Sequence, residues 1–126
     1  MIEFTTSGDI SIEVNGRKLA VAQSYRVRTR RESRPVEAFG AREPIGIMTG
    51  KTAHQVDLSR VQLLDQARGD GVDFYGLSGF TVVIAKPGAR VIYAGCEWSD
   101  IEETAALGSA VLESVSLVAA KRMVLK

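Results

Sequence analysis

The residues best able to carry chemistry are one cysteine and one histidine. Cys96 and His54 could act as a nucleophile and its base, because an adjacent imidazole activates a thiol. No signature sequence surrounds either residue, and Cys96 follows an apolar run, where a free thiol behaves as a small hydrophobic group. One thiol and one imidazole also fall short of a structural zinc site. We therefore predict a buried structural thiol, a histidine on a strand surface, and no catalytic residue, metal or other cofactor.

The carboxylates form two groups that could bind a cation or act as acid and base. Asp70 and Asp73 form the first; the second, here called the acidic cluster, consists of Glu97, Asp100, Glu102 and Glu103. A calcium loop needs oxygen ligands at alternate positions, and residues 65–73 lack that spacing. Neither a nucleophile elbow nor a glycine-rich phosphate loop is present in the sequence. We expect a solvated acidic face. A small hydrolase or ligand-binding barrel using His54, Cys96 or the Asp70/Asp73 pair is an alternative.

A run of arginines is the strongest charge feature. This arginine ridge, five arginines in nine residues, consists of Arg26, Arg28, Arg30, Arg31 and Arg34. On a strand, alternating arginines form a one-sided positive surface that could bind nucleic-acid phosphates. Single-strand binders also stack bases on aromatic side chains, and only 6% of this chain is aromatic. We favour a protein interface in which the ridge of one copy pairs with the acidic cluster of the next, since arginine binds carboxylates bidentately. A nucleic-acid-binding β-barrel is the alternative.

These groups need a scaffold, and its centre is predicted at residues 80–98. Two runs of β-branched and aromatic residues flank Pro87-Gly88, which fits a type II turn, so this stretch is expected to be a hairpin in the middle of the sheet. Asn15-Gly16 is a second hairpin signal. On its return strand, Leu19 and Val21 are expected to face inward.

Periodicity predicts the remaining elements. Alternating apolar residues indicate strands over residues 9–14, 24–30, 52–64 and 110–123. A bulge or strand end is expected near Arg60. The single short helix is expected within residues 64–77, and a short turn at Ser99-Asp100.

The stretch at residues 31–51 has a different composition, with two prolines and three glycines. At about 20 residues it is long for a structureless loop inside a compact domain, so we predict a projecting two-stranded arm or ordered loop. Its apolar residues, which have no obvious core to enter, are Val36, Phe39, Ile45, Ile47 and Met48. Exposed apolar groups on a projecting element mark a partner surface. The arginine ridge, these residues and the acidic cluster together form the candidate assembly interface.

Bulk properties limit the class of protein. The 126 residues suit one β domain over residues 1–126, with a flexible N-terminal arm at 1–8. A net charge of +1 gives no global field to attract nucleic acid or a membrane. No apolar run approaches the ~20 residues of a membrane span, no signal peptide is recognisable, and one cysteine is typical of a reducing cytoplasm. We predict a mostly β fold: a small β-sandwich or barrel with one short α-helix and a long projecting arm or hairpin.

The order of these elements resembles the tail-tube-like proteins of tailed bacteriophages and contractile injection systems. The matching segments are Val14-Asn15-Gly16, residues 24–29, the proline-containing arm, Leu58-Ser59-Arg60-Val61, Asp73-Phe74-Tyr75, residues 80–93, Gly95-Cys96-Glu97-Trp98 and Val111-Leu112-Glu113. The resemblance lies in element order and scattered short matches, with no single diagnostic motif. Tube lumens in that group are usually acidic or neutral, so the arginine ridge would have to lie at an interface and not in the bore.

The resemblance implies a structural virion protein and no enzyme. By that likeness, the chain is a tail-tube subunit that self-assembles into stacked, hexameric rings around a channel for DNA or effector passage. The arm would contact the adjacent ring, and edge strands would pair between subunits. The partners would be other copies, other tail or baseplate proteins and, at most, transient DNA in the lumen. Assembly would occur in the bacterial host cytoplasm and the product would reside in the virion tail. A baseplate, tail-end or tail-completion protein of the same fold is the alternative within this group.

Overall fold

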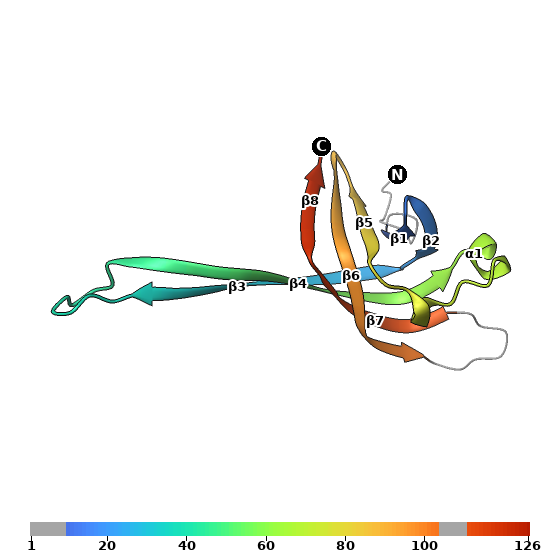
Figure 1. Ribbon diagram of the computed structural model, residues 1–126. Coiled ribbons are helices and arrows are strands. Elements are labelled where there is room, and N and C mark those ends of the chain that lie inside the picture. Colours follow the sequence, from blue (N-terminus) through green and yellow to red (C-terminus); the bar gives the residue numbers. More distant parts are fainter. Residues whose placement is uncertain (1–9, 104–110) are drawn as a thin grey trace.

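The protein is built almost entirely from β-strands (Figure 1). The computed structural model describes residues 10–103 and 111–126, so the flexible arm predicted at 1–8 lies outside the described residues. The strands are β1 Ile10–Val14, β2 Arg17–Val21, β3 Ser24–Val36, β4 Gly46–Leu63, β5 Phe80–Lys86, β6 Ala89–Glu103, β7 Val111–Ala119 and β8 Lys121–Leu125. The helix α1 Asp65–Gly69 and the 3-10 helix η2 Phe74–Gly76 complete the described elements. The predicted fold class is confirmed: mostly β, with one short helix and a long hairpin.

The strands form one antiparallel sheet that curls into a nearly closed ring. The strand order is β2-β1-β5-β6-β7-β4-β3, and β2 also pairs with β4 through Ala20↔Leu63 and Val21↔Gln62. Two strands lie outside this ring: β3 pairs with β4, and β8 pairs with β6. Among the described strands, β3 and β8 therefore each keep one edge without a strand partner, and such edges are sites where another chain can pair.

Two tight hairpins form where the sequence places residues that accept positive φ. Asn15 (φ 52°) and Gly16 (φ 81°) join β1 to β2, and Gly88 (φ 79°) follows Pro87 between β5 and β6. Both hairpin predictions are confirmed. The β5–β6 hairpin lies inside the strand order and not at an end, as expected from its apolar composition.

The return strand β2 departs from simple alternation. The pairing changes from Ile12↔Ala20 to Glu13↔Lys18, which leaves Leu19 as an extra residue. Ala20 is buried opposite Ile12, whereas Val21 is only half-buried. The prediction that Val21 faces inward is wrong, because a bulge moves the inward position by one residue.

Strand β6 is longer than predicted. It runs through Ser99 and Asp100 to Glu103, so the turn predicted at Ser99-Asp100 is wrong. Pairing with β7 continues to Glu103, with a register shift between Trp98 and Asp100. The neighbouring strand keeps this polar segment extended, which its own composition does not reveal.

The last predicted strand is two strands, separated at Ala120. β7 and β8 both pair with β6, and the Ala120 N–H donates to the Ala94 carbonyl at 3.0 Å. Next to this point in β6 is Gly95, with φ 63°, where an added Cβ would lie 3.0 Å from the Ala120 Cβ. From here β8 rises away from the β3–β4 hairpin, which leaves the ring in another direction (Figure 1).

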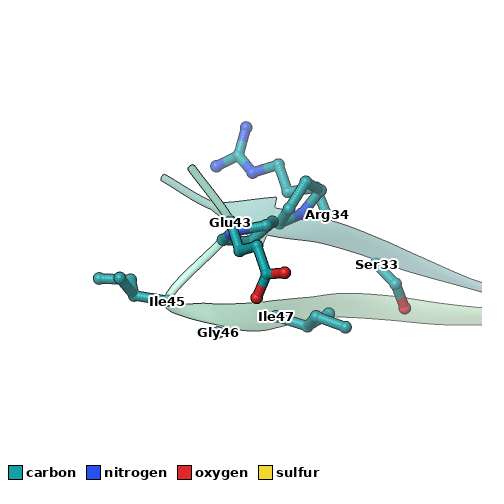
Figure 2. A pocket seen from close by; sticks show the side chains of 8 residues that line it. Ser33, Arg34, Glu43, Ile45, Gly46 and Ile47 are labelled. Atoms are coloured by element: carbon teal, nitrogen blue, oxygen red, sulfur yellow. The ribbon is translucent and has the colours of Figure 1, made fainter. Parts of the chain in front are cut away.

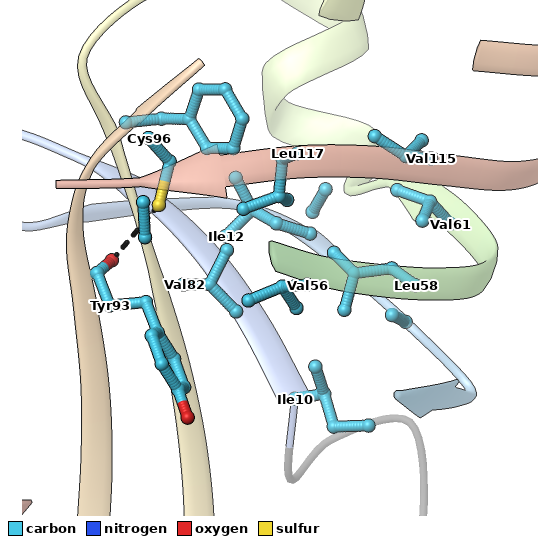
Figure 3. Packing of buried hydrophobic residues seen from close by; sticks show 14 of the residues in the cluster. Ile10, Ile12, Val56, Leu58, Val61, Val82, Tyr93, Cys96, Val115 and Leu117 are labelled. Carbon is cyan, nitrogen blue, oxygen red and sulfur yellow. Dashed lines mark hydrogen bonds between the residues drawn. The ribbon is translucent and has the colours of Figure 1, made fainter. Parts of the chain in front are cut away.

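The core fills the inside of the ring (Figure 3). It consists mainly of β-branched residues and leucines from the ring strands, including Ile10, Ile12, Val56, Leu58, Val82, Val115 and Leu117. Phe74 on η2 packs edge-to-face on Phe80, with ring centroids 5.7 Å apart. Cys96 lies in this core and donates to the Tyr93 carbonyl at 3.2 Å (Figure 3). The predicted buried structural thiol is confirmed.

The helical segment is shorter than the predicted range 64–77, because only α1 and η2 form within it. Gly71, with φ 77°, lies between them in the left-handed region. In the preceding strand, Arg60 has φ 51°, and the buried positions change parity from Leu58 to Val61. The irregularity predicted near Arg60 is present, but as one left-handed residue inside β4 and not as a strand end.

Candidate assembly surface

A long hairpin formed by β3 and β4 dominates the shape of the molecule (Figure 1). Its pairing is continuous from Ser24↔Ser59 at the ring to Val36↔Gly46 at the far end, apart from one register shift. β7 accompanies β4 only as far as His54, so the part beyond that residue projects with no third strand beside it in the described chain. The projecting arm predicted at residues 31–51 is therefore the outer part of this hairpin.

The end of the arm is apolar and exposed. Ile45 is 67% exposed and Ile47 is 72% exposed; Phe39 and Met48 are exposed too, and Val36 is half-buried. Ile45 and Ile47 line an open pocket of about 650 Å³, with Arg34 and Glu43 among the other side chains around it (Figure 2). Solvated apolar side chains on a polar element carry a free-energy cost, which burial against a partner removes.

The arginine ridge lies along β3, and all its members are exposed. Arg26, Arg28 and Arg30 occupy alternate positions and so share one face, whereas Arg31 has the other parity. Arg26 reaches Asp57 on β4 at 3.3 Å, and this is the only ion pair that the ridge makes with a described residue. The other four guanidinium groups are available to a partner.

A bulge interrupts the β3–β4 pairing at the base of the arm. The pairing changes from Arg31↔Thr52 to Ser33↔Thr49, so β4 holds one more residue than β3 across this interval. Gly50 lies at the bulge, where an added Cβ would come within 2.7 Å of Glu32 Oε2 and 3.1 Å of its Cβ. Glycine at this position leaves room for the Glu32 side chain to lie against the opposite strand. The bulge lies between the first four arginines of the ridge and the apolar end of the arm.

The acidic cluster lies on the second half of β6, and half of it is already engaged within the chain. Glu97 accepts hydrogen bonds from Ser78 Oγ at 2.9 Å and from the Gly79 N–H at 2.8 Å. Glu103 accepts a hydrogen bond from the Tyr75 hydroxyl, and this bond is the main cause of the raised pKa of Tyr75. The side chains of Asp100 and Glu102 make no hydrogen bond or ion pair with a described residue. The sequence analysis missed these partners because Tyr75 to Gly79 are distant from β6 in the chain.

The pairing registers place the arginine ridge on β3 and the acidic cluster on β6, with two strands between them. One row across the sheet runs Arg26↔Asp57↔Ser116↔Asp100. The row after the next runs Arg28↔Gln55↔Val118↔Glu97. The outer β3 edge is thus basic and the β6 side acidic, with β4 and β7 between them. Among the described residues no ion pair joins the two groups, so their predicted pairing, if formed, joins different copies.

No hydrogen bond or ion pair joins any two of the residues weighed for catalysis, which are His54, Cys96, Asp70 and Asp73. His54 Nδ1 lies 3.0 Å from Thr29 Oγ1, and its ring packs edge-to-face on Tyr93 at 5.9 Å. Burial raises the pKa of Cys96 to about 11, which disfavours the thiolate needed in a nucleophile. Asp70 pairs with Arg17, and Asp73 accepts from the Tyr75 N–H at 3.2 Å. Within residues 10–103 and 111–126, no group of acidic, histidine or cysteine side chains could hold a metal ion.

Comparison with known proteins adds no family: no family model and no curated protein sequence matches the chain. In the described part of the chain, no helix has the length and apolar character to cross a membrane. The arm and the charges of the sheet therefore carry the functional argument.

Proposed function

We propose that this protein is a structural, non-enzymatic subunit that self-associates into rings, as a subunit of a phage tail tube or a tail-tube-like particle. The observation that carries the proposal is the long β3–β4 hairpin, with an exposed apolar end, on a nearly closed β-ring. In a monomer the apolar end of this arm would stay in water, which carries a free-energy cost that association removes. The resemblance in element order supports the assignment to the tail-tube-like proteins. A baseplate, tail-end or tail-completion protein of the same fold is the alternative within that group.

Three features would each contribute to association. The free β3 and β8 edges offer backbone hydrogen bonds to a strand of another copy, which fixes orientation. The apolar arm end supplies buried area. Arginine–carboxylate pairs between the ridge and the acidic cluster would set register and discriminate against wrong partners.

Shortening the arm tests the proposal. Arg31 and Thr52 are directly paired, so residues 32–51 can be replaced by Asn-Gly, a hairpin turn that keeps the register. We expect the unaltered protein to form rings or tubes, seen by solution mass across concentration and by negative-stain images. The shortened variant should stay a folded monomer at the same concentrations.

A matched variant keeps the arm at full length. Ile45→Ser with Ile47→Ser removes the apolar end and leaves the strands, and both side chains are exposed, so the fold should be retained. Loss of assembly in both variants supports the role of the arm. Normal rings from the shortened variant would contradict it.

A second candidate function, nucleic-acid binding, is favoured by one observation: four ridge arginines have no described ionic partner. The titration of the protein with DNA at low and high salt tests it. Binding that weakens steeply as salt rises, and that Arg28→Gln with Arg30→Gln abolishes, would support this function. No binding at low salt would remove it.

A further inference from the structure

Exposed apolar side chains also lie on β8, with Met123 and Leu125 on one face of the strand and Val124 on the other. Met123, Val124 and Leu125 are 38%, 41% and 50% exposed. β8 pairs with β6 on one side, and no described strand covers its other edge, because the pairing of β4 with the preceding strand β7 ends at His54↔Ala119. An apolar strand with a free edge favours pairing with another chain.

The surroundings of β8 are uniformly basic. Besides Lys121 and Arg122 on the strand, the basic residues here are Lys126, Lys86 at the end of β5 and Arg90 near the start of β6. Lys86, Arg90, Leu125 and Lys126 line an open pocket of about 310 Å³. No acidic residue occurs in residues 120–126 or in the stretch 84–96. A partner segment for this surface should therefore be apolar and acidic.

The arm end of the same chain has this chemistry. The connection at residues 37–45 carries Glu37 and Glu43 against one basic residue, Arg42, and none of the three makes an ion pair with a described residue. Ile45 and Ile47 beside them are mostly exposed. Arg34 lines the same pocket as Ile45 and Ile47, so the arm end as a whole is not net acidic. Its match to β8 lies in apolar character and in Glu37 and Glu43, the two carboxylates that can face the basic side chains there.

The two surfaces of one copy do not meet. The arm and β8 leave the ring in different directions, and the arm end lies at the extremity of the molecule (Figure 1). A contact between them must therefore join two copies. Because it uses different surfaces on each copy, it is a heterologous contact, which generates rings or open stacks and not an isolated symmetric dimer.

We propose that the arm end of one copy docks on β8 of a second copy, with Ile45 and Ile47 against Met123 to Leu125 and with Glu37 and Glu43 facing the basic side chains beside β8. This inference rests on the proposed function, since it names the surface that receives the arm. It goes further by making β8, which the sequence analysis treated only as the end of the last strand, half of the interface.

Cross-linking between two variants, each with one introduced cysteine, tests the contact. Ile47→Cys in one population and Val124→Cys in a second, distinguished by a mass tag, are mixed under assembling conditions and treated with a short bismaleimide. Cys96 is retained, because its thiol is buried and its pKa is about 11. The control pair joins Ile47→Cys to Gln66→Cys, which is exposed on α1. We expect a mixed dimer from the first pair, in at least ten-fold excess over the control pair.

Charge reversal gives an independent measurement. Arg122→Glu with Lys126→Glu should weaken association at least ten-fold, and Glu37→Lys with Glu43→Lys in the same chain should restore most of it. Assembly without the mixed cross-link, or dimers linked only through two Ile47→Cys arms, would overturn this inference and leave the proposed function standing. A monomer at every concentration, with no cross-link, would overturn both.

Discussion

At the scale of single residues, one glycine and one alanine set the direction in which β8 leaves the molecule. Gly95 has φ 63°, and an added Cβ would lie 3.0 Å from the Ala120 Cβ. The residue types at both positions are small, and a side chain at Gly95 would crowd Ala120. The bend separates β8 from β4 and so exposes the apolar strand and its edge.

Gly95→Ala should therefore destabilise the fold by about 1–3 kcal/mol, because a non-glycine residue is strained at positive φ and the new methyl group crowds Ala120. Denaturant unfolding measures the change. Gly46→Ala is the matched control, since Gly46 has open space and is not in the left-handed region. Adding Ala120→Gly should recover the steric part of the loss alone. Equal stability of Gly95→Ala and the control would contradict this account of the bend.

The Asp57 carboxylate on β4 interacts with Arg26 on β3 and with Ser116 on the ring strand β7. Burial raises the pKa of this carboxyl, but the Ser116 hydroxyl, the Arg26 guanidinium and the Gln55 amide lower it by more, so its net pKa lies below the ordinary 3.8. A depressed folded-state pKa means that the folded state holds its proton less tightly than the unfolded chain. The carboxylate therefore stabilises the fold above the unfolded pKa, and this contribution is lost as the pH falls through the folded value.

Asp57→Asn should lower the free energy of unfolding at pH 7 by an amount on the order of 1 kcal/mol, since the pair with Arg26 is largely solvated. The difference from the unaltered protein should shrink as the pH falls below 3.8. Asp100→Asn, which removes a carboxylate without a described partner, is the control. An Asp57→Asn defect that persists undiminished in strong acid would show that the pKa shift isn't its cause.

At the scale of elements, the sequence predicts what is decided locally. Asn15-Gly16 and Pro87-Gly88 carry their turn conformations in two residues, so both hairpins are predictable. The length of β6 is not, since Ser99 and Asp100 are extended only because β7 lies beside them. The prolines, glycines and length of residues 31–51 likewise predict a projecting arm.

Partners distant in the chain explain what the sequence analysis missed at the candidate site. Glu97 and Glu103 look equivalent to Asp100 in the sequence, but Ser78, Gly79 and Tyr75 approach only these two. Which strands are neighbours, and so which rows connect the ridge to the acidic side, also depends on pairings that no local pattern encodes. Residue types predict the kind of surface, whereas pairing registers decide which charges remain free.

The arginine ridge supplies a prediction at this same scale. Arg28→Glu with Arg30→Glu should weaken association at least ten-fold at low salt and much less at high salt, because exposed charges are screened there. The fold should be unaffected, since both side chains are exposed and have no described partner. Sedimentation across concentration and salt measures the effect. Unchanged association at both salt concentrations would exclude the ridge from the interface.

At the scale of the whole molecule, a heterologous contact gives an assembly two different ends. Each copy carries an arm end and a β8 surface, so a chain of copies always presents one free arm and one free β8 until it closes. Two variants can each lose one half of the contact. The arm-shortened variant keeps β8, and Val124→Asp with Leu125→Asp keeps the arm.

These two variants should complement each other only once. Alone, each should remain a monomer, because one surface of the arm–β8 contact is missing. An equimolar mixture should give a species of twice the subunit mass, formed by the arm of one variant on β8 of the other, and no larger product. Native mass spectrometry distinguishes these outcomes. Large assemblies from the mixture would show that other interfaces suffice for growth. If the two variants stay monomeric in the mixture, the arm end does not bind β8, because the mixture provides one intact surface of each kind and a heterologous contact needs no more.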